Sequence, residues 1–134
     1  MAKFKEEYLD KKEPLHFRRL HVTELSEEEK AFDTKVKVLY TDHGAEKTFE
    51  AVGNGPIDAV KRGLQESLDL DVKILDYEEH ALQSGSNSQA AAYIHLLDSN
   101  TGRVTYGVGV SSNITRASVR AIFSALNRLG LGEK

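Results

Sequence analysis

Two stretches of this chain resemble each other at a constant offset of 58 residues, with no gap. Apolar, glycine and arginine positions coincide: Val36 with Ile94, Val38 with Leu96, Gly44 with Gly102, Val52 with Val110, Ala59 with Ala117, Arg62 with Arg120, Leu64 with Ile122, and Leu68 with Leu126. A repeat of this length indicates one supersecondary unit that is used twice. It predicts an internal two-fold and two similar turn-to-helix junctions, which are the first places to look for a ligand.

Each copy predicts three strands followed by a helix. Alternating apolar residues and turn residues place the strands at residues 15–23, 32–40, 46–52, 72–82, 89–97 and 104–110. The first helix is expected to begin at Pro56, where a missing N–H costs nothing, and the second after the 111–113 junction, ending before Gly130. The fold class is therefore α+β: two βββα units whose antiparallel sheets pack against two helices. Surplus apolar surface is expected to be covered by a second copy, as a homodimer.

The chain length suits one domain, because 134 residues lie within the usual domain size. Residues 1–14 are mostly charged and are expected to be a linker or leading segment. Residues 15–134 are expected to form the domain, with repeat units at about 15–70 and 71–130.

The composition excludes several classes of protein. The chain has no cysteine, so disulfides and thiolate chemistry are excluded, which fits a cytoplasmic location. No apolar run approaches the roughly 20 residues of a membrane span, so no membrane partner is expected. The net charge is -3, without the basic footprint of a nucleic-acid binder, so no nucleic-acid partner is expected either.

No pattern in the chain predicts catalysis. Nucleophile elbows, Walker loops and paired catalytic carboxylates do not occur, so we expect no catalytic residue and no cofactor in this domain. The five histidines lack zinc-ligand spacing, so no metal site is expected; they are His16, His21, His43, His80 and His95. Asp76, Glu78 and His80 alternate along one predicted strand and either orient a polar ligand or form a solvated face.

Two stretches could bind a small ligand. The turn at residues 53–56 (GNGP) leads into a helix, and helix N-termini bind carboxylates; alternatively, both glycines only permit the tight turn. Residues 84–92 (SGSNSQAAA) have small side chains, which leave either a cavity or a close backbone approach. An apolar amino acid would need such a cavity, donors for its carboxylate and acceptors for its ammonium group.

Three long, ungapped motifs carry a resemblance to a known family. They are GNGPIDAV, LDYEEHALQSGSNSQAAAYIHL and YGVGVSSNITRASVRAIFSALNRL. Together they resemble the C-terminal regulatory domain of 2-isopropylmalate synthase, from about Leu15 to Leu129. The resemblance implies an allosteric domain of leucine biosynthesis that forms a dimer, binds leucine as its effector and acts on a catalytic barrel. That barrel, which uses a divalent metal to condense acetyl-CoA with 3-methyl-2-oxobutanoate, is too large for this chain.

The resemblance also implies a leucine site at both junctions and on the strands between them. The corresponding residues here are Asn54, Gly55, Pro56, Ile57, Asp58, Ile74, Tyr77, Ala81, Ser88, Ala90, Asn113 and Ile114. Asp58 departs from the family, since some relatives have a small apolar residue there. It is expected either to meet the ammonium group of the ligand or to crowd the site.

Four functions remain open at this point. The first is a leucine-sensing regulatory domain, and the second is an isoleucine-sensing domain like that of citramalate synthases. Pockets discriminate two ligands that differ in the placement of a methyl group by only about 1–3 kcal/mol. The third is a structural dimerisation module without a ligand, and the fourth is an independent small enzyme, for which no constellation of catalytic groups is visible.

Overall fold

The structure, a computed structural model, describes residues 14–25, 32–82 and 89–129. The predictions for residues 1–13, for the small polar loop at 83–87 and for Gly130 lie outside these ranges. The elements are β1 (Leu15–Glu24), β2 (Thr34–Asp42), β3 (Ala45–Gly53), α2 (Pro56–Leu68), β4 (Val72–Leu82), β5 (Gln89–Asp98), β6 (Val104–Ser111) and α3 (Ile114–Arg128). The predicted βββα order, used twice, is confirmed.

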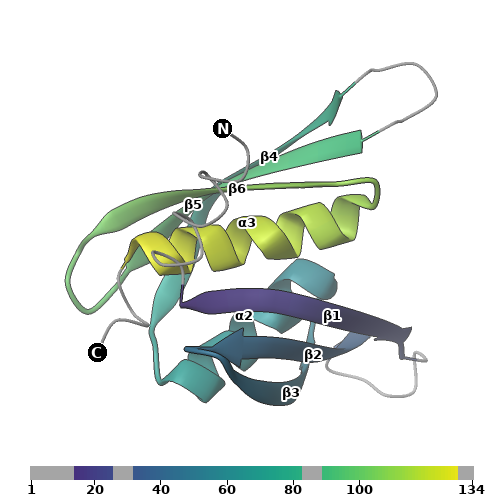
Figure 1. Cartoon of the computed structure of the whole chain (residues 1–134), viewed down its shortest axis with the longest axis horizontal. Helices are drawn as coiled ribbons and strands as arrows, with labels where there is room; N and C mark the ends of the chain where they lie inside the picture. Colours follow the sequence, from purple (N-terminus) through teal and green to yellow (C-terminus); the bar gives the residue numbers. More distant parts are fainter. Residues whose placement is uncertain (1–13, 26–31, 83–88, 130–134) are drawn as a thin grey trace.

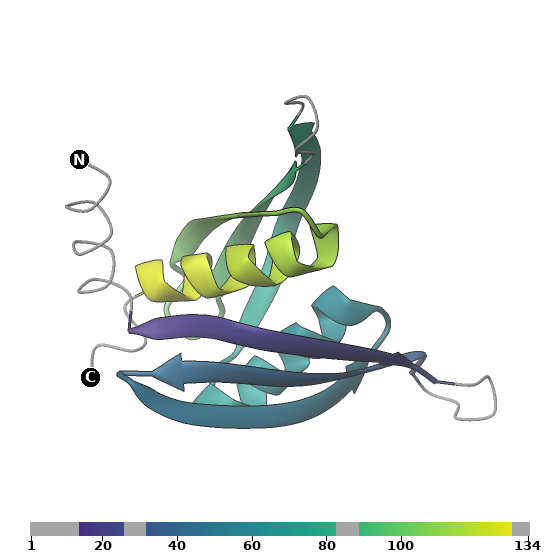
Figure 2. The same ribbon diagram turned by 45° about the vertical axis from the view of Figure 1, so that its right-hand side comes forward.

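The six strands form two antiparallel sheets, β1-β2-β3 (the first sheet) and β4-β5-β6 (the second sheet). Helix α2 packs on β2 and β3, and α3 packs on β5 and β6 and also contacts β1 and α2. Figures 1 and 2 both show α3 between β6 and β1, so the second helix joins the two units.

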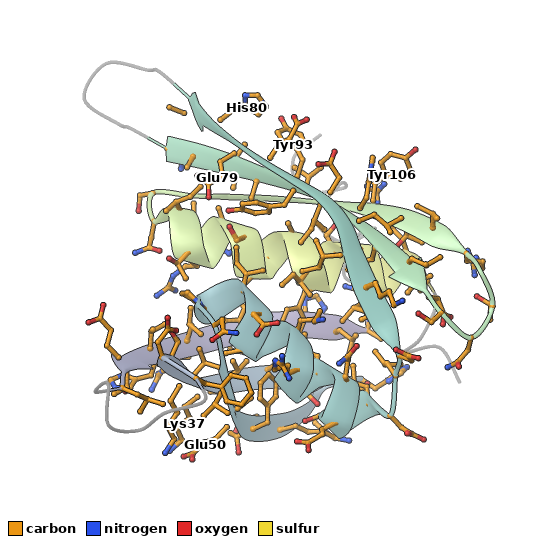
Figure 3. The ribbon with its side chains drawn as sticks, turned by 180° about the vertical axis from the view of Figure 1, so that it is seen from behind. Lys37, Glu50, Glu79, His80, Tyr93 and Tyr106 are labelled. Atoms are coloured by element: carbon orange, nitrogen blue, oxygen red, sulfur yellow. The ribbon has the colours of Figure 1, made fainter. Side chains whose placement is uncertain are left out.

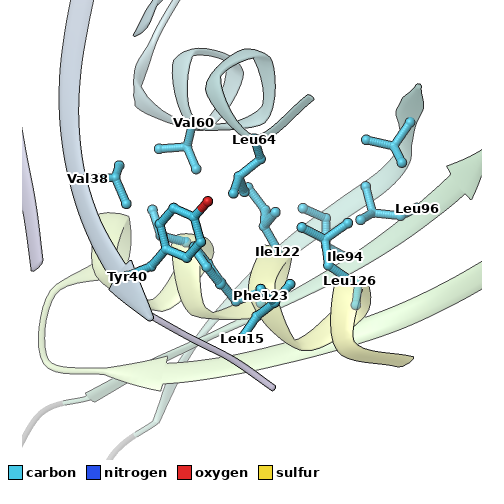
Figure 4. Packing of buried hydrophobic residues seen from close by; sticks show 14 of the residues in the cluster. Leu15, Val38, Tyr40, Val60, Leu64, Ile94, Leu96, Ile122, Phe123 and Leu126 are labelled. Carbon is cyan, nitrogen blue, oxygen red and sulfur yellow. The ribbon is translucent and has the colours of Figure 1, made fainter. Parts of the chain in front are cut away.

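One hydrophobic core serves both units (Figure 4). Phe123 of α3 lies beside two aromatic rings of the first unit, with centroids 5.8 Å from Phe17 and 5.6 Å from Tyr40. The largest fully buried apolar side chains come from both units: Leu15, Val36, Val38, Tyr40, Val60, Leu64, Ile94, Leu96, Val119, Ile122 and Leu126. Because neither unit buries its apolar residues alone, the two fold as one body.

The two hairpins differ in register although their sequences align without a gap. In the first sheet, Val36 pairs with Ala51; in the second, Ile94 pairs with Gly107 and not with Gly109 at the repeat-equivalent position. The slip is two residues, which is one pleat period, so every side chain keeps its face. The hairpin connections differ accordingly: the first is the pair His43–Gly44 between β2 and β3, and the second is the longer 99–103 loop.

Helix α3 lies directly on β6 because glycines face it. A Cβ atom at Gly107 would lie 1.9 Å from the carbonyl oxygen of Ala121, and one at Gly109 would lie 2.1 Å from that of Ala117. In the first unit the small residue is on the helix instead: a Cβ atom at Gly63 would lie 2.1 Å from the ring of Phe49. The repeat therefore keeps a close helix–strand contact by two different means.

Polar side chains of α3 bind the backbone of the strands on either side of it. The buried Asn127 side chain accepts from the N–H of Leu15 (3.0 Å) and donates to its carbonyl (2.9 Å). Arg120 donates to the carbonyl of Val110 in β6 (2.8 Å). These bonds satisfy backbone groups of β1 and β6, which are edge strands and have no neighbouring strand on that side.

Candidate functional site

The two strand-to-helix junctions lie at the same end of the molecule. Figures 1 and 2 show α2 and α3 both beginning at the right-hand side, and Figure 1 shows β4 and β5 extending past the helices on that side as a two-stranded arm. The two junctions and the arm therefore lie toward the same end of the molecule. Four of the predicted site residues pack against the same core cluster: Ile57, Ile74, Tyr77 and Ile114.

The first junction already binds carboxylates of its own chain. Gly55 is the N-cap of α2 with a φ of 102°, and Pro56 is in the first turn, as predicted. The N–H of Asn54 donates to Asp58 Oδ2 (3.0 Å), and the N–H of Gly55 donates to Asp33 Oδ1 (3.1 Å). This loop thus presents N–H groups that can donate to carboxylate oxygens.

Asp58 closes the turn to which it belongs. Besides the Asn54 N–H, it accepts from Arg62 Nε at 2.9 Å, one helical turn further along. Burial alone would raise the pKa of Asp58, but the Asn54 N–H and the Arg62 guanidinium outweigh it and hold the pKa below its ordinary value. The negative charge of Asp58 is therefore balanced by Arg62 of the same chain. The sequence did not predict this role.

The second junction is held by its asparagine. Asn113 is the N-cap of α3, and its side chain accepts from the N–H of Arg116 at 3.0 Å. Its own N–H donates to Ser111 Oγ at 3.2 Å. An asparagine in this position satisfies one of the unpaired N–H groups of the first helical turn. Asn113 therefore has a capping role beside the ligand contact predicted for it.

The arm presents a row of site residues on its inner face, the face that continues the helix-covered side of the second sheet. A bulge at Leu75 separates Ile74 from Asp76, which brings Ile74 and Tyr77 to the same face despite their odd spacing. Beyond it, β4 pairs with β5 as Tyr77–Ile94, Glu79–Ala92 and Ala81–Ala90. The inner row of β4 is therefore Tyr77, Glu79 and Ala81, of which the last two lie opposite alanines. Ser88, the remaining predicted contact, lies outside the described residues.

Tyr77 connects the arm to the N-terminal half of α3. Its hydroxyl lies 2.6 Å from Ser118 Oγ and also donates to the carboxylate of Glu79. Ser118 is fully buried and donates to the carbonyl of Ile114 at 3.0 Å. Burial raises the pKa of the Tyr77 hydroxyl, and the hydrogen bond to Glu79 raises it further. The hydroxyl therefore stays protonated and acts as a donor near neutral pH.

Sequence reasoning missed three polar residues of this region: Asp33, Glu79 and Ser118. Glu79 follows Tyr77 at the strand period of two, so the alternation that placed Tyr77 and Ala81 on one face could have found it. The trio noticed in the sequence, Asp76, Glu78 and His80, lies on the other face, where His80 Nε2 is 3.3 Å from Glu78 Oε1. Figure 3 shows Glu79 on the side of α3, and His80, Tyr93 and Tyr106 on the opposite side.

A large hollow of the described structure lies elsewhere. About 780 Å³ opens between β3 and α2, and none of the predicted site residues lines it. Its rim is charged, with a Lys35–Glu50 ion pair at 3.4 Å. An aliphatic side chain gains little from such surroundings, because the charged groups would lose water and receive no polar partner in return.

The two sheets differ sharply on their outer faces. At equivalent repeat positions, the first sheet carries charged and polar residues and the second carries aromatic and aliphatic ones: Lys35 and Tyr93, Lys37 and His95, Glu46 and Val104, Thr48 and Tyr106, Glu50 and Val108. Six of the seven exposed large apolar residues in the described ranges belong to the second sheet. On β6 the glycines face α3, so the apolar row faces outward. We call this surface, made by Tyr93, Val104, Tyr106, Val108 and Val110, the outer apolar face.

Comparison with known proteins places the chain in a family. Residues 1–130 match the family described as the LeuA allosteric (dimerisation) domain. The chain belongs to this family. A 2-isopropylmalate synthase of Clostridium acetobutylicum is 38% identical over 127 residues, which are 93% of this chain and 22% of the relative. Those of Helicobacter hepaticus and Mycobacterium ulcerans are 33% and 38% identical over 94% and 93% of the chain, and 23% and 21% of their own lengths.

The chain thus spans about a fifth of the length of these curated relatives and matches their allosteric domain. Within residues 14–25, 32–82 and 89–129, no three histidine, aspartate or glutamate side chains gather in a way that could hold a metal ion. In the same ranges, neither helix is long and apolar enough to cross a membrane.

Proposed function

We propose that this domain binds leucine as an allosteric effector and mediates feedback inhibition of a 2-isopropylmalate synthase, acting as a homodimer. The observation that carries the proposal is that both helices begin at the end of the molecule from which the alanine-bearing arm extends, in a domain of an allosteric family. In this proposal the ligand carboxylate takes N–H groups of the first junction. The aliphatic side chain of the ligand packs against Ile57, Ile114 and the alanines of the inner face of the arm. The catalytic barrel and a cytoplasmic location belong to the same proposal.

The first junction supports a carboxylate ligand because it already holds carboxylates. Asp33 and Asp58 accept from two adjacent N–H groups of the turn, at 3.1 and 3.0 Å. We propose that the leucine carboxylate displaces the Asp33 contact. Asp33 is exposed and is otherwise held only by the neutral Thr34 hydroxyl, whereas Asp58 is held by the Arg62 guanidinium.

Calorimetric titration with leucine, isoleucine and valine tests this proposal. We expect leucine to bind most tightly, with a preference over isoleucine within the range of about 1–3 kcal/mol that such pockets reach. A preference for isoleucine would favour the citramalate synthase reading. The absence of heat with every ligand at millimolar concentration would favour the ligand-free module and contradict the proposal.

A pair of glycine variants separates ligand contact from backbone strain. Gly55 and Gly44 both have positive φ, 102° and 86°, and a Cβ atom at either position meets nothing within 4 Å. Gly55→Ala and Gly44→Ala should therefore lose similar stability. Only Gly55→Ala should weaken leucine binding, because only there would the added methyl group enter the space of the ligand. Equal affinities for the two variants would argue against a site at the first junction.

The outer apolar face is the proposed dimer interface. In this proposal a second copy of the chain covers the outer apolar face. The first sheet carries charged residues at the equivalent positions, so it could not form an apolar interface of this kind. The family description as a dimerisation domain supports the same choice. Side chains of this kind, aromatic and aliphatic, are typical of the core of obligate interfaces.

Sedimentation analysis with matched variants tests the interface. Tyr106 and Thr48 are equivalent in the repeat and both are exposed. Tyr106→Glu should convert a particle of twice 14.9 kDa into one of 14.9 kDa, whereas Thr48→Glu should leave the dimer intact. Dissociation by Thr48→Glu alone would place the interface on the first sheet.

A further inference from the structure

The hydroxyl pair of Tyr77 and Ser118 is short of one donor. Three contacts meet at these two groups: Tyr77 with Glu79, Tyr77 with Ser118, and Ser118 with the carbonyl of Ile114. Each contact needs one proton, and two hydroxyls supply only two. The Glu79 carboxylate and the Ile114 carbonyl can only accept. In this arrangement, one of the three acceptors is always left without its hydrogen.

Glu79 is also a carboxylate without a cation in the described structure. Within residues 14–25, 32–82 and 89–129, the ion pairs engage Asp42, Glu50, Asp58 and Glu78, and none engages Glu79. Its only hydrogen-bond partner in these ranges is the neutral Tyr77 hydroxyl. Of the other carboxylates at the site, Asp58 already has the Arg62 guanidinium, and Asp33 accepts from the Gly55 N–H and the Thr34 hydroxyl. Glu79 therefore offers the stronger attraction to a positively charged ligand group.

The position of Glu79 suits such a group. It lies on the inner face of the arm between Tyr77 and Ala81, opposite Ala92. The neighbouring alanines leave room for an aliphatic side chain, and the helix N-termini at this end favour a carboxylate. An α-amino acid carries these three chemical features around one carbon atom.

We propose that Glu79 binds the ammonium group of the effector and thereby makes the site select an amino acid over the carboxylic acid with the same side chain. The ammonium group brings three N–H donors and a positive charge, so it supplies the missing donor. The Tyr77 hydroxyl is then free to donate to Ser118, and Ser118 to Ile114. The proposal rests on the proposed function, since it assumes an amino acid at this site.

Titration of the full chain with leucine and with 4-methylpentanoate, which is leucine without its amino group, tests this role. The wild-type chain should bind leucine at least about 10-fold more tightly than 4-methylpentanoate, because a hydrogen bond to a charged group typically changes affinity by about this factor or more. Glu79→Gln should lose most of this preference by weakening leucine about 10- to 100-fold while leaving 4-methylpentanoate unchanged. Glu78→Gln is the matched control: the adjacent glutamate faces the other side of the same strand and should keep the wild-type preference.

Each outcome of this experiment decides something. If Glu79→Gln keeps the wild-type preference for leucine, other groups bind the ammonium and the proposal is overturned. If it weakens both ligands equally, Glu79 only shapes the site and the proposal is again overturned. The melting temperature without ligand shows whether the variant folds, and Glu79→Asp, which keeps the charge, should restore part of the preference. A wild-type chain that binds neither ligand would instead refute the proposed function.

Discussion

Replacing Gly107 with alanine tests how closely α3 lies on β6. The new Cβ atom would lie 1.9 Å from the carbonyl oxygen of Ala121 and 2.6 Å from the nitrogen of Ala125. Ordinary contact begins at 3.4 Å, so strand and helix would have to separate by about 1.5 Å. Both clashing atoms belong to the backbone, so no side chain can rotate away.

The cost follows from the clash and from the hydrogen bonds that the separation would break. Overpacking alone costs about 1–3 kcal/mol. Thr105 Oγ1 donates to the Ala125 carbonyl at 3.0 Å, and the Val108 N–H donates to Ser124 Oγ at 3.3 Å. Losing these bonds adds about 1 kcal/mol each, so Gly107→Ala should lower the free energy of unfolding by about 3–5 kcal/mol.

Urea denaturation at a fixed protomer concentration measures this loss, since the stability of a dimer depends on concentration. Gly44→Ala is the control, because its φ is 86° and its Cβ meets nothing within 4 Å. Backbone strain there should cost about 1–2 kcal/mol. If Gly107→Ala costs no more than Gly44→Ala, α3 does not rest on β6 as the structure has it.

Three further substitutions have defined outcomes. Asn127→Ala should lower the free energy of unfolding by about 2–4 kcal/mol, because it leaves the N–H and carbonyl of Leu15 without the side chain that binds them. Chemical denaturation measures this loss. A loss no larger than that of a substitution at an exposed surface position would contradict it. Asp58→Asn should cost about 1 kcal/mol near neutral pH. The pKa of Asp58 is lowered in the folded state, so its contribution to stability is complete above the unfolded value of 3.8 and disappears as the pH falls through the folded value. Thermal denaturation should therefore show the melting temperatures of the two proteins converging in acid. A difference that persists there would refute the role given to the Asp58 carboxylate. Ser118→Ala should cost about 1 kcal/mol, because it removes the hydrogen bonds of the Ser118 hydroxyl. It should keep the preference for leucine over 4-methylpentanoate, since the Glu79 carboxylate is unchanged; a lost preference would move the ammonium contact to Ser118.

The repeat and its periodicities predicted the fold well because they report local physics. The alternation through β2 predicted its buried face, and Thr34, Val36, Val38 and Tyr40 are indeed buried. Proline at the start of α2 and glycine in the hairpins acted as sequence signals for their own backbone conformations. These signals need no knowledge of distant residues.

Pairing and facing were harder to predict because they depend on contacts between elements. In β6 the valines alternate with glycines, and hydrophobicity alone would turn the valines inward. The structure turns them outward, because only Gly107 and Gly109 admit the backbone of α3. The register slip of the second hairpin was hidden in the same way, since a two-residue shift leaves the alternation unchanged.

At the site, the family resemblance supplied the residues and the structure supplied their roles. Asp58 and Asn113 have capping partners that no spacing rule assigned. The bulge at Leu75 resets which alternate residues of β4 share a face, so the common face of Ile74 and Tyr77 was hidden in the sequence. A bulge depends on the partner strand, so the sequence of β4 alone could not reveal it.

The most direct test of the central claim is an amide chemical-shift map of the chain titrated with leucine. If leucine binds as proposed, the largest changes cluster at both junctions and on the inner face of the arm, at residues such as Asn54, Ile57, Ala81, Ala90 and Ile114. Amides around the β3–α2 hollow, such as those of Glu50 and Glu66, should stay unchanged. Changes confined to that hollow, or none at saturating leucine, would contradict it.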